Sequence, residues 1–529
     1  MQLHTLIKDL PITLRDPAGD VVLTSLTDDS RAVQPGGLFV ARPGADGDAT
    51  RFVAQAIQAK AAALLLPAMD ATEIDRLNVP STIAIAIADR QTPIDQRLCG
   101  QLAERFYDHP STKLKLIGVT GTNGKTTTAT IAKHLLESAG HKTGLIGTVE
   151  LDTGSLQGPT PATLTTPGAI ELSRLLAEMV DNGCACCVME VSSHALDQGR
   201  ADHVRFTAAA FTNLTQDHLD YHGDMQSYAD AKAILFESLD EDATAVLNID
   251  DRASGRMQAG CKGRVLHSAI LPLGDGASTG HAADTMCAVA PTKMTAAYSQ
   301  AEFAGPWQSF TTTLPMPGRF NLNNALQAAA LAHAAAGLDA AQLRQGLETC
   351  RAVPGRLEPV GPKWPDPVTS NRDLPSVLVD YAHTPDALIN VGKAMHELTQ
   401  RAGGKLITVF GCGGDRDRNK RPLMAQAAQQ FADTVVLTSD NPRTEDPQQI
   451  LNDAEAGFAP RDMTEPNPQT HTIADRAEAI RFAIHLAGKN DTVLIAGKGH
   501  EDYQIIGTPQ HHFDDREQAA AAMREKSGQ

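Results

Sequence analysis

The stretch "STKLKLIGVTGTNGKTTTATIAKHLLESAG", residues 111–140, decides the fold class of this chain. A β-branched apolar run leads into a glycine-rich loop. A helical pattern with Ile131, Leu135 and Ala139 on one face follows and stops at Gly140. Glycine N–H groups, a lysine and the N-terminus of a helix together form a site for phosphate groups. An α/β domain that holds a nucleotide is therefore predicted.

The loop itself is a compact variant of the usual phosphate-binding loop. The full G-x-x-x-x-G-K-[ST] spacing requires glycine at position 119, where this chain has Val119. Lys125 can supply a point charge, and Thr126 is placed to ligate Mg²⁺. The alternative is a plain glycine-rich turn, but the strand before it and the helix after it favour nucleotide binding. The expected nucleotide contacts are Gly121, Thr122, Asn123, Gly124, Lys125, Thr126 and Thr127.

Length and composition restrict the class of protein. A chain of 529 residues suggests about three domains. Forty-six basic and 63 acidic residues give a net charge of −17, which makes nucleic acid or an anionic membrane an unlikely partner. We see no secretory signal and no apolar run of the ~20 residues that span a bilayer. The eight cysteines lack the paired spacing of a zinc site, so a reduced, cytoplasmic chain is expected.

The chain divides into three predicted domains, residues 1–111, 112–353 and 354–529. The first should contain short strands and an alanine-rich helix at 52–63. The second includes an irregular polar stretch, 274–308, which we interpret as surface hairpins and loops. In the third, expected strands alternate with expected helices, the pattern of parallel βαβ units. Those strands lie at 376–382, 405–415, 434–440 and 491–499, and the helices at 384–400, 424–432 and 476–487.

Acidic and histidine residues follow the nucleotide loop along the chain. Glu190 ends the apolar run "CACCVME", where a strand would direct its carboxylate at a metal. His218 and His222 have the i, i+4 spacing of a helical zinc pair. Gly223 and the turn-like sequence argue against a long helix there, so a polar loop or a Mg²⁺-associated histidine is the stronger alternative. Lys232 is expected near the start of a helix, and by itself reads as a solvated lysine.

A second candidate site lies in "VVLTSDNPRTEDP", residues 435–447. A buried strand ends in a turn that carries Asp440, Asn441 and Arg443. Open α/β sheets bind ligands at the carboxyl ends of their strands, so this turn could grip a ligand. The structural alternative is that Arg443 caps a helix or pairs with Glu445.

A series of motifs then resembles one known family. "VTGTNGKTTT", "MEVSSHALDQGR", "FTNLTQDHLDYHG", "YADAKAILF", "PGRFNLNNALQA", "VPGRLE", "DYAHTPDAL", "FGCGGDRDRNKRPLM", "SDNPRTEDP" and "AGKGHEDYQ" occur in the order seen in Mur ligases. The resemblance extends from about residue 26 to residue 515. It implies an N-terminal domain for a uridine nucleotide, a central ATPase domain and a C-terminal Rossmann-like domain. It also implies amide formation through an acyl phosphate, in peptidoglycan precursor synthesis.

The resemblance implies a role for each matching residue on the ATP side. Lys125, Lys232 and His218 would be catalytic. Two Mg²⁺ ions would be held by Thr126, Glu190, His218 and Lys232, the last as a carbamate formed with CO₂. This implied role reverses the reading of Lys232 as solvated. Asn324, Arg356 and Asp380 match further ATP contacts, and His383 lies near them in the sequence.

The remaining matches concern the two other substrates. Ser30, Thr165, Thr166, Ser192, Gln198 and Arg200 match contacts to a UDP-N-acetylmuramoyl dipeptide. Arg416, Asp440, Asn441, Pro442, Arg443, Gly497 and Glu501 match contacts to meso-diaminopimelate. A planar guanidinium at Arg443 can hold the distal carboxylate that L-lysine lacks. The loop at 41–52 and the insert at 360–375, an expected surface loop, depart from the family pattern.

Other functions remain open at this point. The same ligase could use L-lysine, or the acceptor could be a folate, as in folylpolyglutamate synthetases. A regulatory NTPase would turn over nucleotide without an amino acid, and a degenerate homologue would only bind. The motifs favour the ligase with diaminopimelate, ATP and UDP-linked dipeptide as its small-molecule partners. A monomer is expected.

Overall fold

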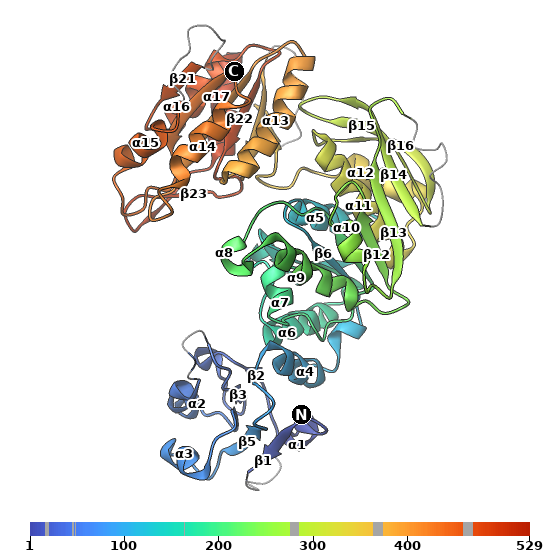
Figure 1. Cartoon of the computed structure of the whole chain (residues 1–529), viewed down its shortest axis with the longest axis vertical. Coiled ribbons are helices and arrows are strands. Elements are labelled where there is room, and N and C mark those ends of the chain that lie inside the picture. The colour runs from blue at the N-terminus through green and yellow to red at the C-terminus, as the bar shows by residue number, and fades with distance from the viewer. Residues whose placement is uncertain are drawn as a thin grey trace. The chain divides into compact units, whose positions relative to one another are not determined.

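The computed structural model describes all residues except 16–20, 45–46, 48, 163, 276–284, 363–373, 459–468 and 529. It divides the chain into two compact units. The first comprises Met1–Ala269, Ala283–Cys287 and Gln327–Gln342. The second comprises Ile270–Ala282, Ala288–Leu326 and Leu343–Gln529. Figure 1 follows the chain through them from blue to red. The expected surface insert at 360–375 lies mostly outside the described residues.

The chain begins with a small five-stranded sheet in the first unit. Its strand order is β1-β5-β4-β3-β2, with β1 antiparallel and the others parallel. The strands are β1 (Ile12–Leu14), β2 (Leu26–Thr27), β3 (Leu38–Val40), β4 (Ala63–Leu66) and β5 (Ala84–Ala88). The helices are α1 (Leu3–Ile7), α2 (Val53–Gln58), α3 (Ala71–Arg76) and α4 (Gln96–Phe106). The helix expected at 52–63 is thus shorter, because the apolar run from Ala63 is buried as a strand.

The nucleotide loop belongs to a larger parallel sheet in the same unit. Its parallel part has the order β13-β12-β11-β6-β10-β7, and β8 and β9 continue it antiparallel beyond β7. The strands are β6 (Lys115–Thr120), β7 (Thr143–Ile146), β8 (Glu150–Asp152), β9 (Thr160–Pro161), β10 (Cys186–Glu190), β11 (Ala208–Phe211), β12 (Thr244–Asn248) and β13 (Arg264–Ile270). Cys186 and Cys187 lie buried in β10, as expected for small apolar residues.

Helices flank this sheet and carry much of the site. They are α5 (Lys125–Ser138), α6 (Ala169–Asp181), α7 (Ser193–Asp197), α8 (Leu219–His222), α9 (Met225–Glu237) and α10 (Ser254–Gln258). The predicted face of α5 is confirmed by Ile131 and Leu135, which are fully buried. Two further helices, α11 (Arg319–Ala336) and α12 (Ala340–Thr349), follow the antiparallel strands β14 (Met286–Met294), β15 (Ser299–Gly305) and β16 (Gln308–Leu314). The hairpin expected within 274–308 is confirmed, because the antiparallel pair β14 and β15 lies there. Its expected place at the surface is wrong, because most residues of both strands are buried.

The last part of the chain is a six-stranded sheet of order β17-β18-β22-β19-β20-β21. Only β17 is antiparallel, which confirms the parallel βαβ prediction. The strands are β17 (Glu358–Val360), β18 (Ser376–Asp380), β19 (Leu406–Cys412), β20 (Thr434–Ser439), β21 (Gln469–Thr472) and β22 (Thr492–Ala496), with a separate hairpin of β23 (Tyr503–Ile505) and β24 (Gln510–His512).

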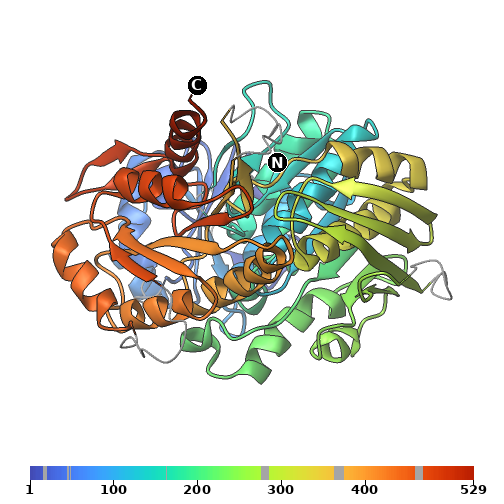
Figure 2. The same ribbon diagram turned by 90° about the horizontal axis from the view of Figure 1, so that it is seen from above.

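Alternate side chains of these strands enter two separate cores. One core includes Val409, Val436 and Ile495 and packs against α16 (Arg476–Leu486) and α17 (Asp515–Ser527). The other includes Phe410 and Leu437 and packs against α13 (Pro385–Arg401), α14 (Lys420–Gln429) and α15 (Pro447–Glu455). Figure 2 shows these helices on either side of the sheet. Helices on both faces leave only the strand ends open to a ligand.

Candidate active site

The nucleotide loop joins β6 to α5 in the predicted way. Gly124 is the N-cap of α5 with φ +86°, and Gly121 has φ +145°. A Cβ at Gly121 would lie 1.9 Å from the Thr212 hydroxyl oxygen. The Lys125 ammonium donates to the carbonyls of Gly121 (3.0 Å) and Thr122 (2.9 Å). The loop is thus curled around its own lysine, and only glycine fits at position 121.

Glu190 ends β10 as predicted and is almost fully buried. Its carboxylate accepts hydrogen bonds from the Thr126 hydroxyl (3.0 Å), the Thr148 hydroxyl (3.0 Å) and the Thr148 backbone N–H (2.8 Å). Thr148 in turn lies 3.0 Å from the Thr165 hydroxyl. These bonds direct the carboxylate toward the start of α5. Thr148 was not singled out in the sequence, although a hydroxyl residue just after a parallel strand is a usable signal.

Lys232 is the residue whose surroundings differ most from the simplest reading of the sequence. It lies well inside α9 rather than near its start, and its side chain is 1% exposed. Its ammonium donates to the Gly121 carbonyl (2.9 Å) and lies 4.4 Å from the centre of the Tyr228 ring. Burial, and then the neighbouring Lys125, hold the pKa of Lys232 well below its usual range. The solvated reading is wrong, because α9 packs this face against the nucleotide loop.

Three histidines and a tyrosine meet beside α9. The His194 ring lies 4.9 Å from that of His218, 5.4 Å from that of His222 and 4.2 Å from that of Tyr221, measured between centroids. The His222 Nε2 is 3.0 Å from the Ser193 hydroxyl. The short α8 confirms that no long helix forms there. Among the described residues, no cluster of three or more His, Cys, Asp or Glu side chains is arranged to hold a metal ion.

The residues expected to contact the muramoyl dipeptide form a connected network on the same unit. The Thr166 hydroxyl donates to the Glu190 carbonyl (2.8 Å) and accepts from the Ser192 N–H (3.0 Å). Arg200 donates to the Thr166 carbonyl (2.9 Å) and to the Gln198 side-chain oxygen (2.6 Å). Ser30 lies apart in the first sheet region, where its hydroxyl donates to Gln55 (2.7 Å).

The second site is a turn at the carboxyl end of β20. Asp440 and Asn441 are nearly buried there, and Arg443 has φ +50°. The Arg443 N–H donates to the Ile505 carbonyl (3.0 Å), and its carbonyl accepts from Gly507 (2.7 Å). The β23–β24 hairpin therefore clamps the turn in place. Gly497 approaches from the end of β22, and a Cβ there would lie 2.8 Å from the Asp440 carboxylate.

The structure contradicts an ion pair between Arg443 and Glu445. The Glu445 carboxylate accepts from Arg421 (2.7 Å), Arg418 (2.8 Å) and the Asp415 N–H (2.5 Å), and Arg421 above all lowers the pKa of Glu445 to about 2. Arg443 instead donates one N–H to the Gly414 carbonyl (2.7 Å). Since a guanidinium has five N–H donors, Arg443 keeps donors for a ligand among the described contacts. Arg416 is exposed nearby.

The other predicted ATP residues in the second unit have mostly internal partners. The Asp380 carboxylate accepts from the N–H groups of Leu357 (2.7 Å) and Ala382 (2.8 Å), and burial raises its pKa. The Arg356 guanidinium lies 4.9 Å from the centre of the Tyr381 ring. The Asn324 amide is 3.5 Å from the Asn321 side-chain oxygen.

Comparison with known proteins identifies the family. The family described as "Mur ligase middle domain" matches residues 119–332, and "Mur ligase, glutamate ligase domain" matches residues 355–499. A relative from Synechococcus elongatus, named UDP-N-acetylmuramoyl-L-alanyl-D-glutamate–2,6-diaminopimelate ligase, is 43% identical over 99% of both chains. The chain belongs to the Mur ligase family. A relative of the same name from Geobacillus thermodenitrificans is 41% identical over 99% of this Mur ligase and 100% of that protein.

Solved structures agree with this assignment. A solved UDP-N-acetylmuramoyl-L-alanyl-D-glutamate–2,6-diaminopimelate ligase superimposes with a TM-score of 0.66 at 32% identity, covering 96% of this Mur ligase and 95% of that chain. MurF from Acinetobacter baumannii shares the fold, with a TM-score of 0.57 at 19% identity over 90% of each chain. A folylpolyglutamate synthase from Mycobacterium tuberculosis also shares it, with a TM-score of 0.54 at 18% identity over 82% of this chain and 95% of that one.

The donor set around Glu190 suits the Mg²⁺ that Mur ligases require. Magnesium prefers oxygen ligands, and usually takes one or two carboxylates together with substrate phosphates. Glu190 offers the carboxylate, and the Thr126 hydroxyl lies 3.0 Å from it. A site of this kind needs no larger protein cluster, so the ligands present in this Mur ligase fit the ion.

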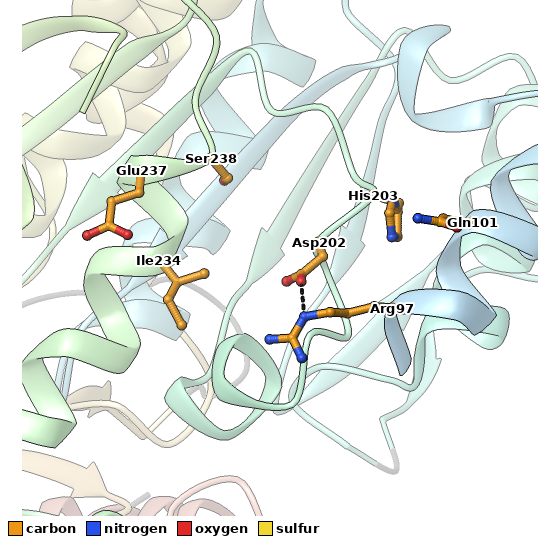
Figure 3. Close-up of a pocket in the computed structure, with 7 residues that line it drawn as sticks. All are labelled: Arg97, Gln101, Asp202, His203, Ile234, Glu237 and Ser238. Carbon is orange, nitrogen blue, oxygen red and sulfur yellow. Dashed lines mark hydrogen bonds and ion pairs between the residues drawn. The ribbon is translucent and has the colours of Figure 1, made fainter. Parts of the chain in front are cut away.

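A cavity of about 410 Å³ is lined in part by residues of α4 and α9. It is lined by Arg97, Gln101, Asp202, His203, Ile234, Glu237 and Ser238. Two of these residues, Arg97 and Asp202, form an ion pair (2.7 Å), which Figure 3 marks with a dashed line. None of the predicted site residues lines it. In this Mur ligase the chemistry is therefore expected at the strand ends rather than in this cavity. No helix among the described residues is both long and apolar enough to cross a bilayer.

Proposed function

We propose that this Mur ligase joins meso-diaminopimelate to UDP-N-acetylmuramoyl-L-alanyl-D-glutamate, with ATP activating the glutamyl carboxylate as an acyl phosphate. The observation that carries the amino-acid choice is the turn after β20. It presents a guanidinium that Glu445 does not neutralise, beside the nearly buried Asp440. A substrate with both a carboxylate and an ammonium at its distal end matches these two charges. The full-length relatives named for this reaction support the assignment.

The nucleotide loop would hold and neutralise the transferring phosphoryl group. Lys125 sits within the loop, where its ammonium can leave the Gly121 and Thr122 carbonyls for phosphate oxygens. Thr126 and Glu190 would hold Mg²⁺, which supplies charge neutralisation when bound. The contacts of the Glu190 carboxylate with Thr148 keep it aimed while the substrates are exchanged.

We also propose that Lys232 is carbamylated and contributes, with His218, to a second Mg²⁺ site. A neutral amine attacks CO₂ and an ammonium does not. The burial that depresses the pKa of Lys232 therefore supports the modification. The product carries a carboxylate-like anion where the bare lysine lies beside Lys125. That anion is better matched to this position than a second cation.

The remaining roles follow the three-domain organisation, with boundaries proposed at 1–111, 112–353 and 354–529. Ser30 would contact the uridine nucleotide, and the network from Thr165 to Arg200 the muramoyl dipeptide. Asn324, Arg356 and Asp380 are proposed as further ATP contacts. We place the reaction in the cytoplasm, where ATP is available, and propose that the protein acts as a monomer.

The experiment measures phosphate release with ATP, Mg²⁺ and the UDP-linked dipeptide, adding either meso-diaminopimelate or L-lysine. Turnover should require diaminopimelate. Arg443→Ala should lower kcat/KM for diaminopimelate by about 10²–10³-fold, because truncating one partner of a buried charge pair costs roughly 2–5 kcal/mol. Arg418→Ala is the matched control, since the largely exposed Arg418 side chain pairs with Glu445 and is not assigned to the amino-acid site, and it should change the rate little.

The two parts of the proposal can fail separately. Equal turnover with L-lysine would remove the specificity argument and leave the ligase. Phosphate release with neither amino acid present would favour a regulatory NTPase instead.

A further inference from the structure

A buried lysine contacts two residues of the amino-acid site proposed above. Lys498 follows β22, and its side chain is fully buried. Its ammonium donates to the Tyr503 carbonyl and lies 3.3 Å from the Glu501 carboxylate and 3.4 Å from the Asn441 side-chain oxygen. A buried ammonium is costly unless it is fully paired, and an apolar residue of this size would be cheaper for stability. Stability alone therefore does not explain the buried ammonium of Lys498, and we look for a functional role.

The amide of Asn441 is already occupied by neighbouring groups. Its oxygen accepts from the Ile505 N–H (2.9 Å) as well as facing Lys498. Its nitrogen donates to the Oε2 atom of Glu501 (2.9 Å). Asn441 thus serves as a bridge between the lysine and the glutamate, and among the described contacts its amide keeps one N–H donor for a ligand.

The same contacts distinguish the two carboxylate oxygens of Glu501, because they engage only one of them. Oε2 is engaged by both Asn441 and Lys498. For Oε1, the described residues provide no hydrogen bond, so this oxygen remains available as an acceptor. A carboxylate held by one oxygen cannot rotate, and its second oxygen keeps a fixed direction.

We propose that Lys498 is a positioning residue that acts through Glu501: it fixes one carboxylate oxygen so that the other receives the ammonium of the incoming amino acid. The inference rests on the proposed function, because it assumes that Glu501 contacts the amino acid. Because the Lys498 side chain is fully buried, the proposal assigns it no contact of its own with substrate or nucleotide. Its loss should raise the KM for the amino acid by about 10–100-fold and change kcat at saturation less than threefold.

The test compares Lys498→Met with wild type in steady-state kinetics, with each of the three substrates varied in turn. The KM for meso-diaminopimelate should rise, while the KM values for ATP and the UDP-linked dipeptide stay unchanged. Lys526→Met is the matched control. Its ammonium likewise donates to backbone carbonyls, those of Ile484, His485 and Ala487, but lies away from the site. If Lys498→Met does not fold, Lys498→Gln, which retains a donor without the charge, replaces it.

A double-mutant cycle separates positioning from a merely structural role. If Lys498 acts through Glu501, Glu501→Gln should remove most of the effect of Lys498→Met on KM. Additive effects, or a KM unchanged in the lysine variant, would overturn the inference while the ligase stands. Wild-type protein without any diaminopimelate-dependent turnover would instead overturn the proposed function, and this inference with it.

Discussion

At the scale of single residues, backbone geometry and burial set what each position tolerates. Gly121 has a positive φ, and the Thr212 hydroxyl occupies the place of a Cβ. Any other residue at this position would therefore have both a strained backbone and a steric overlap. Lys232 donates to the carbonyl of that same glycine. A substitution at Gly121 should therefore disturb both the glycine-rich loop and the position of Lys232, the lysine proposed for carbamylation.

Gly121→Ala should abolish ATP binding and lower stability by about 2 kcal/mol or more, because the new methyl group overlaps the Thr212 hydroxyl and the backbone is strained. Nucleotide titration and thermal melting measure the two effects. Gly140→Ala is the control. Its φ is +89°, but nothing lies within 4 Å of an added Cβ. It should show only a smaller strain cost of about 1 kcal/mol and normal ATP binding. Equal losses in both variants would contradict the overlap.

At the scale of elements, one buried ion pair connects the helices of the last sheet to the strand ends at which the amino-acid site is proposed. Arg476 begins α16 and Asp515 begins α17, and both are fully buried, 2.7 Å apart. The Arg476 guanidinium also donates to the carbonyls of Ser439 (3.3 Å) and Ala496 (3.1 Å), the last residues of β20 and β22. The two turns carrying Asp440 and Gly497 thus share one support.

Asp515→Asn should lower the free energy of unfolding by about 3–5 kcal/mol, because it leaves a buried guanidinium without its counter-charge. Denaturant unfolding of the whole protein, followed through the transition of the region that contains the last sheet, measures this loss. Glu517→Gln in the same helix turn is the control, since its partner His512 is exposed and such pairs contribute roughly 0–1 kcal/mol. A loss near 1 kcal/mol for both variants would show that Arg476 is satisfied by the carbonyls alone.

At the scale of the whole molecule, we expect the free energy of unfolding to depend on pH in part through His500. Burial, and then Arg356 and Arg516, lower the pKa of His500 to about 4. In the unfolded chain the His500 ring binds a proton below about pH 6.5, whereas in the folded chain the ring stays neutral down to about pH 4. Stability is therefore unaffected by His500 above pH 6.5 and decreases as the pH falls from 6.5 to 4.

His500→Gln should flatten that decline. The difference between variant and wild type should reach about 2 kcal/mol near pH 4, less than the full shift implies because the ring is partly exposed. Thermal melts between pH 7 and pH 4 measure it. Parallel curves for the two proteins would show that His500 is protonated in the folded state as readily as in the unfolded one.

Much of the architecture could be predicted because it is encoded locally. The order strand, loop and helix around Gly121 and the alternation of strands and helices after residue 375 follow from short-range periodicity. The hairpin of β14 and β15 was expected but its burial was not, because that burial comes from neighbours in a sheet rather than from a clear alternation in sequence. The short helix α2 was overextended for the same reason, since the run at Ala63–Leu66 is apolar in either state.

The sequence by itself determined the family, the glycine-rich loop between strand and helix, Glu190 at the end of one strand and Asp440 directly after another. Only the tertiary structure decided which side chains are buried and which partners they take. Lys232 meets a carbonyl 111 positions away, and Lys498 meets an amide 57 positions away. Such contacts are absent from any local pattern. The cost of burying a charge depends on what surrounds it, so a lysine in the same local sequence can be solvated in one fold and buried against backbone carbonyls in another.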